Sequence, residues 1–141
     1  MHARTIFVAA LAILASACSQ QDKKPRLAES AVVGLWVSDS LPATNAAARV
    51  YRLSMTDQGM AEFVSEYVGN TTITERGTWD GADTLVRVVV RGTGTASRPT
   101  SLLLAIRGET LGLVQFDTTS WGPTGLTLYR RSATTTSTTA R

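Results

Sequence analysis

Four carboxylates occupy positions at which they could act together. Glu62 and Glu66 fall on one face of a run that alternates like a β-strand. Glu75 and Asp80 follow in and just after the next run, where they could lie near the first pair. Paired carboxylates transfer protons or bind a cation, as in a carboxylate-based hydrolase. The same alternation is typical of the solvated face of a hairpin, and we expect that arrangement, with Arg76 pairing to a glutamate across the strands.

Two methionines flank a short turn and offer soft metal ligands. Met55 and Met60 stand on either side of residues 57–59, and thioethers can hold Cu(I). A third soft ligand is not evident nearby, so we expect both side chains to pack in a hairpin and no metal to bind.

The chain is poor in the side chains that most enzymes use. It has one histidine, His2, and one cysteine, Cys18, and His2 lies in a leader segment described below. The rest of the chain therefore lacks the residues for Ser-His-Asp or Cys-His catalysis, His-ligated zinc or a CxxC redox pair. No phosphate-binding loop or dinucleotide fingerprint occurs in the sequence. We expect a protein that is not an enzyme and carries no cofactor.

A glycine-rich loop bracketed by two arginines is a candidate anion site. Arg91 and Arg98 enclose the segment 92–95, GTGT, whose backbone amides and flanking guanidinium groups could hold a phosphate or a carboxylate. The alternative is a mobile loop whose charges keep the protein soluble.

A tryptophan in the last long loop is a candidate contact residue. Trp121 lies between Ser120 and Gly122, and a tryptophan at the mouth of a barrel can anchor a partner or stack on a ligand. It could equally act as a lid that seals the end of the barrel. Trp36 and Trp79 fall within strand-like runs and are expected in the core.

The N-terminus has the three zones of a secretory signal peptide. Arg4 provides a positive start, residues 6–14 form an apolar run, and residues 15–17 are small. The apolar run is shorter than the roughly 20 residues that span a bilayer, so a cleaved leader is favoured over a membrane-spanning helix. We assign residues 1–17 to the signal peptide.

The leader is followed at once by the cysteine. Residues 14–18, LASAC, resemble the lipobox of bacterial lipoproteins, in which small residues precede an invariant cysteine. In that class the thiol receives a diacylglycerol and cleavage follows just before the cysteine. The resemblance implies that Cys18 is acylated with chains such as palmitate. It also implies that Ser19 directs the protein to the outer membrane, where the periplasmic face is favoured and the cell surface is the alternative. The alternative is ordinary cleavage that leaves Cys18 as a free thiol.

Composition divides the remaining chain into a tether, one domain and a tail. Residues 18–30 are polar and contain Pro25, which predicts a flexible tether after the lipidated cysteine. Residues 31–131 suffice for one core, and residues 132–141 form a Ser/Thr-rich tail that we expect to be disordered. Loss of the leader lowers the net charge from +3 to +2, so nucleic-acid binding is not indicated. We expect a monomer held at the membrane by its lipid.

The domain consists of short alternating runs separated by turn residues. Tyr51, Leu53 and Met55 share one face of the clearest run. Most connections are too short for a parallel crossover, which predicts an all-β, antiparallel up-and-down meander closed as a lipocalin-like barrel. The eight expected strands are residues 32–38, 50–56, 60–68, 72–79, 84–91, 101–106, 110–117 and 126–131.

Two of these runs carry further expectations. The run 84–91 is largely apolar on both faces, which predicts a central strand that is covered on both sides. In the run 72–79, Ile73 and Trp79 are expected on one face, and Gly77 predicts a bulge or a bend.

Several motifs within residues 32–131 resemble a known group of proteins. They are residues 75–79 (ERGTW), 106–113 (IRGETLGL), 120–122 (SWG) and 125–130 (GLTLYR). Together they resemble small bacterial lipoproteins with lipocalin-like barrels, in particular the N-terminal domain of the NlpE copper-resistance and envelope-stress lipoproteins. The resemblance implies the barrel and an envelope setting. The CxxC of that family has no counterpart here, so copper or redox sensing is not implied.

These observations favour a membrane-anchored binding module that is not an enzyme. A small ligand or an envelope partner would engage the open end of the barrel at Trp121, Ser120, Arg91 and Arg98. The alternative is an inhibitor or sensor of an envelope enzyme, such as a lysozyme inhibitor, because a basic loop could plug a carboxylate-lined cleft. A hydrolase based on the carboxylates is the third hypothesis.

Overall fold

The computed structural model describes residues 27–132 of the chain. The predicted signal peptide, the lipidated Cys18, the tether up to residue 26 and the tail from residue 133 lie outside the described residues. Within residues 27–132, no helix has the length and apolar character needed to cross a bilayer.

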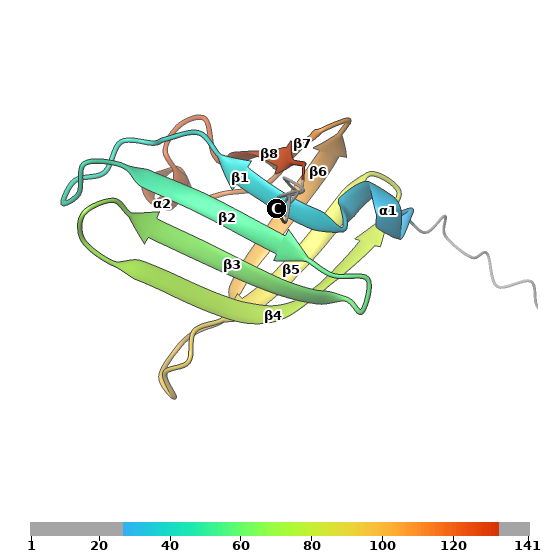
Figure 1. The fold of residues 1–141 in the computed structure, drawn as a ribbon, viewed down its shortest axis with the longest axis horizontal. Helices are drawn as coiled ribbons and strands as arrows, with labels where there is room; N and C mark the ends of the chain where they lie inside the picture. Colours follow the sequence, from blue (N-terminus) through green and yellow to red (C-terminus); the bar gives the residue numbers. More distant parts are fainter. Residues whose placement is uncertain (1–26, 133–141) are drawn as a thin grey trace, which may run out of the picture.

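Eight antiparallel strands follow one another around a closed barrel (Figure 1). Each strand pairs with the next, and the last closes the wall on the first, with Val37 opposite Tyr129. The predicted all-β, eight-stranded antiparallel barrel is confirmed. The strands are β1 (Gly34–Ser38), β2 (Arg49–Met55), β3 (Met60–Tyr67), β4 (Thr72–Ala82), β5 (Leu85–Arg91), β6 (Thr100–Arg107), β7 (Thr110–Leu113) and β8 (Thr127–Arg131).

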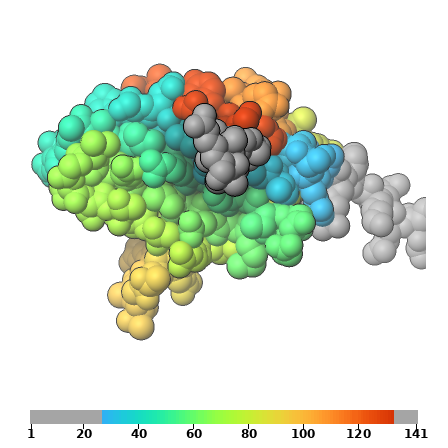
Figure 2. Space-filling view, viewed as in Figure 1, coloured from blue at the N-terminus to red at the C-terminus, as the bar shows by residue number. Residues whose placement is uncertain are grey.

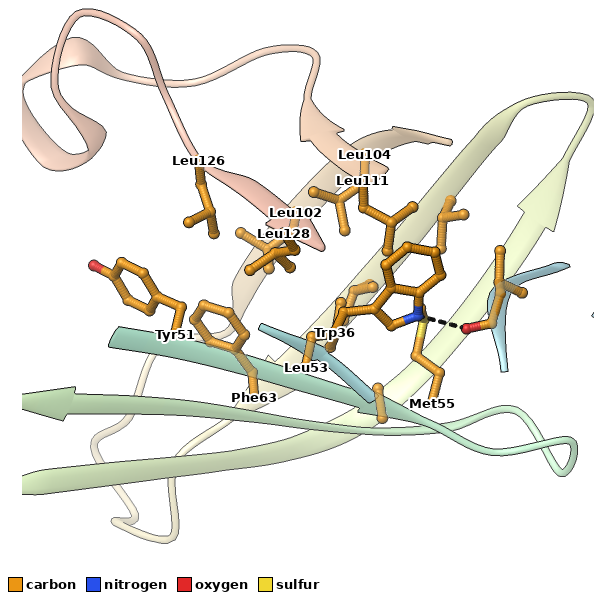
Figure 3. Close-up of a cluster of buried hydrophobic side chains, with 14 of the residues drawn as sticks. Trp36, Tyr51, Leu53, Met55, Phe63, Leu102, Leu104, Leu111, Leu126 and Leu128 are labelled. Atoms are coloured by element: carbon orange, nitrogen blue, oxygen red, sulfur yellow. Dashed lines mark hydrogen bonds between the residues drawn. The ribbon is translucent and has the colours of Figure 1, made fainter. Parts of the chain in front are cut away.

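The interior of the barrel is filled by side chains from alternate strand positions. In β2, the predicted inward face of Tyr51, Leu53 and Met55 is buried, with exposed fractions of 4%, 0% and 2%. Figure 3 shows leucines of the later strands closing over Leu53 and Phe63. Full burial of each large apolar side chain contributes about 1.5–3 kcal/mol, so this packed interior is the main source of stability.

The outer face of β5 is exposed, and the prediction that this strand is covered on both sides is wrong. Val86, Val88 and Val90 point inward and are buried. Leu85 and Val89, on the outer face, are 40% and 37% exposed. The barrel wall is a single layer, and no described element packs over this part of it.

Gly77 lies in a regular stretch of β4 rather than in a bulge. It pairs with Ala61 on one side and with Val90 on the other, without a break in register. A Cβ atom at this position would meet the carbonyl oxygen of Val89 well inside van der Waals contact. The glycine therefore lets the backbones of β4 and β5 approach closely where the wall curves.

The barrel has two different ends, which lie at opposite sides of Figure 1. We call one the hairpin end: it carries the short connections at residues 56–59, 83–84 and 108–109, together with α1 (Glu29–Val32). We call the other the loop end: it carries residues 39–48, 68–71, 92–99 and 114–126, the last of which includes α2 (Thr118–Trp121). The predicted site residues Trp121, Ser120 and Arg98 belong to the loop end.

The hairpin end is closed by α1 and an inward-facing arginine. The Trp36 indole Nε1 donates a hydrogen bond to the Val32 carbonyl at 2.8 Å (Figure 3). The Arg130 guanidinium carbon lies 4.3 Å from the centre of the Trp36 ring. In the plane of the guanidinium, Arg130 donates to the carbonyls of Val33, at 2.9 Å, and Ala31, and it pairs with Glu109 at 2.9 Å. This cation is therefore stacked on an aromatic ring, hydrogen-bonded and ion-paired at once.

The segment before β1 begins to pack on the barrel earlier than predicted. The tether was expected to reach residue 30 and the first strand to begin at residue 32, but residues 29–32 form α1 and Val32 is buried. Leu27 packs against the core as well, beside Gly81. The apolar side chains of Leu27 and Val32 account for this difference, because they cover the otherwise open interior.

Candidate binding site at the loop end

The four predicted carboxylates do not converge. Glu62 pairs with Arg76 at 2.7 Å and Glu66 pairs with Arg52 at 2.6 Å, all on the outer face of the barrel. This confirms the expected cross-strand pairing of a solvated hairpin face. Within residues 27–132, no group of three or more acidic, histidine or cysteine side chains could hold a metal ion.

The other two carboxylates lie on opposite faces of β4. Glu75 stands opposite the buried Phe63 and therefore faces inward, where it accepts a hydrogen bond from the Thr100 hydroxyl at 2.8 Å. Asp80 stands opposite Arg87 on the outer face. The arrangement brings no pair of these four groups together for acid–base chemistry.

The two methionines also separate. Met55 is buried in the interior, whereas Met60 is 50% exposed on the outer face. They flank the turn as the sequence indicates, but their thioethers point to opposite sides of the wall. The expectation of hairpin packing holds for Met55 alone.

The two predicted arginines do not share a site with Trp121. Arg91 stands opposite Arg76 on the outer face of the barrel and is exposed. Arg98 is exposed in the connection 92–99, which projects from the body of the molecule in Figures 1 and 2. Any contact made by Arg98 is therefore made beyond the barrel wall.

Trp121 closes part of the loop end from above the aromatic core. Its ring centre lies 5.3 Å from that of Tyr51 and 6.4 Å from that of Phe63. Tyr51 and Phe63 are themselves stacked at 5.4 Å. Such tilted contacts between aromatic rings are stabilising. The lid that the sequence offered as an alternative is the arrangement observed, and the half-buried indole leaves one side open to solvent.

The helix that carries Trp121 is fixed by an acidic N-cap. The Asp117 carboxylate accepts hydrogen bonds from the backbone amides of Thr119, at 3.0 Å, and Ser120, at 3.2 Å. The Ser120 hydroxyl donates to the same carboxylate at 2.7 Å. These bonds hold the pKa of Asp117 below its usual value of 3.8. The hydroxyl proton of Ser120, which was predicted as a ligand contact, is therefore engaged in a hydrogen bond that stabilises the start of α2.

The residue that the sequence analysis missed is Arg49, at the start of β2. Its side chain points inward with Tyr51, and its guanidinium carbon lies 5.1 Å from the centre of the Tyr51 ring. The Nε atom is buried and has no hydrogen-bond partner. Among the residues that the structure describes, the Arg49 guanidinium forms no ion pair. Leaving a buried donor unpaired costs about 1–3 kcal/mol.

A groove of about 440 Å³ opens beside this guanidinium. That volume is in the range of sites for small molecules. Apart from Arg49, the groove carries no charged side chain. Its walls are uncharged and mostly polar: Pro42, Ala43, Thr44, Asn45, Tyr67, Thr119, Ser120 and Gly122.

Backbone hydrogen bonds hold the walls of this groove in place. Leu41 and Arg49 exchange two backbone hydrogen bonds, each 2.8 Å long. The Asn70 side chain donates to the Asn45 carbonyl at 3.1 Å, which ties the connection 68–71 to the connection 39–48. The groove is thus formed by fastened loops, a condition for binding without a large entropic cost.

The hydroxyl of Tyr51 lies between the core and the loop end. In Figure 3 it points away from the leucine side chains. Burial raises the pKa of this hydroxyl above its ordinary value of 10.0, although the positive charge of Arg49 lowers it. At neutral pH the Arg49 cation is therefore not balanced by Tyr51.

Comparison of the chain with protein-family models, with curated proteins and with solved structures gives no match.

Proposed function

We propose that this protein is a non-enzymatic binding module of the bacterial envelope, anchored through lipid on Cys18, whose loop end takes a small ligand. The observation that carries the proposal is the groove beside Trp121, into whose floor a buried and unpaired guanidinium atom of Arg49 is built. At the hairpin end a smaller pocket of about 200 Å³ opens beside residues 57–59, and the inward-facing Arg130 there is hydrogen-bonded to the carbonyls of Val33 and Ala31.

The disposition of the acidic groups supports binding rather than hydrolysis. Glu62 and Glu66 are bound to arginines on the outer surface, and neither lines the groove. The groove is instead lined by hydroxyl, amide and aromatic groups around one cation, which can hold and orient a ligand.

Site-specific photo-crosslinking in intact cells tests the proposal. A benzophenone amino acid placed at Thr119, in the groove, should give a discrete adduct that the same group at Thr84, at the hairpin end, does not give. Both positions are exposed, so the two variants are matched. The same products from both positions, or none from Thr119, would contradict the assignment of the loop end.

The lipid anchor is tested separately by metabolic labelling. Palmitate should label the wild-type chain and leave the Cys18→Ser variant unlabelled, because Cys18 is the only cysteine in the sequence. Equal labelling of both chains would rule out the lipoprotein assignment.

The projecting connection 92–99 favours a second candidate, an inhibitor of an envelope enzyme. Arg98 is exposed on this projection, where it could enter a carboxylate-lined cleft such as that of lysozyme. The purified chain should then slow lysozyme, and Arg98→Glu should abolish the effect while Arg107→Glu, exposed at the other end of β6, preserves it. Uninhibited lysozyme activity would exclude this candidate.

A further inference from the structure

Arg49 differs from the other arginines near the loop end in its surroundings. Arg52 and Arg76 lie on the outer wall, exposed and paired with glutamates. The Arg49 side chain faces inward, and one face of its guanidinium is covered by Tyr51. Stacking on a ring leaves the in-plane N–H groups available, and the structure shows the Nε–H among them without a partner.

The Arg49 guanidinium is partly buried, lines the groove, and has no acceptor for its buried Nε–H, an arrangement that favours binding of an anion. Taking a cation out of water is unfavourable unless a counter-charge or hydrogen bonds compensate. No acidic side chain lines the groove: Asp117 accepts the bonds that cap α2, and the inward-facing Glu75 accepts a hydrogen bond from Thr100. The groove is therefore positively charged at its floor.

We propose that the groove binds a small organic molecule through an oxyanion, a carboxylate or a phosphate, held by the Arg49 guanidinium. The planar fork of arginine matches such groups and can donate two parallel hydrogen bonds. Thr44, Asn45 and Thr119 supply further polar contacts, and Tyr67 supplies an aromatic wall. The volume of about 440 Å³ accommodates a ligand larger than the anionic group itself. This inference rests on the proposed function and names the class of ligand.

Benzoate, phenyl phosphate and benzamide are suitable probes, because they share a ring and benzamide lacks the charge. The full chain in detergent micelles is titrated with each, and the side-chain Nε–H resonances of the arginines are followed by NMR. The Arg49 signal is identified by its loss in Arg49→Gln. Benzoate and phenyl phosphate should both shift this signal, whereas benzamide should leave it in place. The anion with the lower Kd in these titrations is the preferred ligand class.

Variants that remove the same charge at different positions distinguish binding at Arg49 from a general attraction of anions to the protein. Arg49→Gln should weaken benzoate binding about tenfold or more, as expected for loss of charged hydrogen bonds, with Arg49→Lys intermediate. Arg98→Gln removes the same charge from an exposed loop position and should leave the affinity unchanged. The backbone amide spectrum of each variant reports whether the barrel is intact.

Three results would overturn the inference. They are equal binding of benzamide and benzoate, unchanged benzoate affinity in a folded Arg49→Gln variant, and no shift of the Arg49 signal at millimolar concentrations of either anion. Each of them leaves the proposed function standing if crosslinking at Thr119 still gives its adduct. Loss of that adduct would instead contradict the proposed function itself.

Discussion

Two inward-facing arginines at opposite ends of the barrel have opposite surroundings. Arg130, at the hairpin end, stacks on Trp36, donates hydrogen bonds to two backbone carbonyls and forms an ion pair with Glu109. Arg49, at the loop end, stacks on Tyr51 but has a buried Nε–H without an acceptor. The N–H groups of Arg130 are bonded within the fold, whereas a buried N–H group of Arg49 is not. The difference is the basis for our proposal that the loop end, rather than the hairpin end, takes a ligand.

The two tryptophans that close the ends should differ most in their effect on stability. Trp36 is fully buried, so Trp36→Ala should lower the free energy of unfolding by about 3–5 kcal/mol. Trp121 is half-buried, and Trp121→Ala should cost about 1 kcal/mol. Urea unfolding of both variants measures the difference. Similar losses would show that the loop end is as much a part of the core as the hairpin end.

Substitution of the arginine at the hairpin end should also lower the free energy of unfolding more than substitution of the arginine at the loop end, with a smaller difference between the two variants. Arg130→Gln leaves the carbonyls of Ala31 and Val33 without their donor and Glu109 without its cation, for a loss of about 3 kcal/mol. Arg49→Gln removes an unpaired buried donor but also the cation–π contact with Tyr51. These effects have opposite signs, so the free energy of unfolding should change by about 0.5 kcal/mol or less. A large loss in Arg49→Gln would mean that this residue is structural too.

The smallest expected effect is a pH dependence at the loop end. Because the pKa of Tyr51 is raised in the folded protein, the folded state keeps its proton above pH 10.0 while the unfolded state loses it. The stabilisation is therefore complete below pH 10.0 and is lost as the pH rises through the folded pKa. Tyr51→Phe should flatten this alkaline decline in stability. An unchanged decline in the variant would assign it to other groups.

All eight strands could be predicted because a single-layered wall separates a packed interior from water, although β7 ends at residue 113 rather than 117 and β4 extends to residue 82 rather than 79. That condition imposes the two-residue period seen at Tyr51, Leu53 and Met55, and turn residues mark each reversal. The prediction was wrong for the outer side of β5, because the apolar residues Leu85 and Val89 face solvent there. Apolar residues on both faces of a strand therefore do not by themselves indicate that another element packs over its outer face.

The candidate site could be predicted only in part. The sequence indicates Trp121, because a tryptophan stands out in a loop, but it also drew attention to Arg91 and Arg98, which lie outside the groove. Extending the inward positions of β2 back by two residues would have placed Arg49 inside the barrel. The expected strand began at residue 50, so this signal was missed. That the cation lacks a partner depends on how the connections 39–48 and 114–126 pack around it, which a local sequence pattern does not determine.

The most direct test of the contrast between the two ends is unfolding by urea with and without benzoate. A ligand that binds only the folded state at tenfold its Kd should add about 1.4 kcal/mol to the free energy of unfolding. At that benzoate concentration we predict this gain in wild type, in Arg98→Gln and, from a lower baseline, in Arg130→Gln, but a gain of about 0.4 kcal/mol or less in Arg49→Gln, whose Kd is at least about tenfold higher. An equal gain in Arg49→Gln would contradict the account, since the anion would then bind elsewhere.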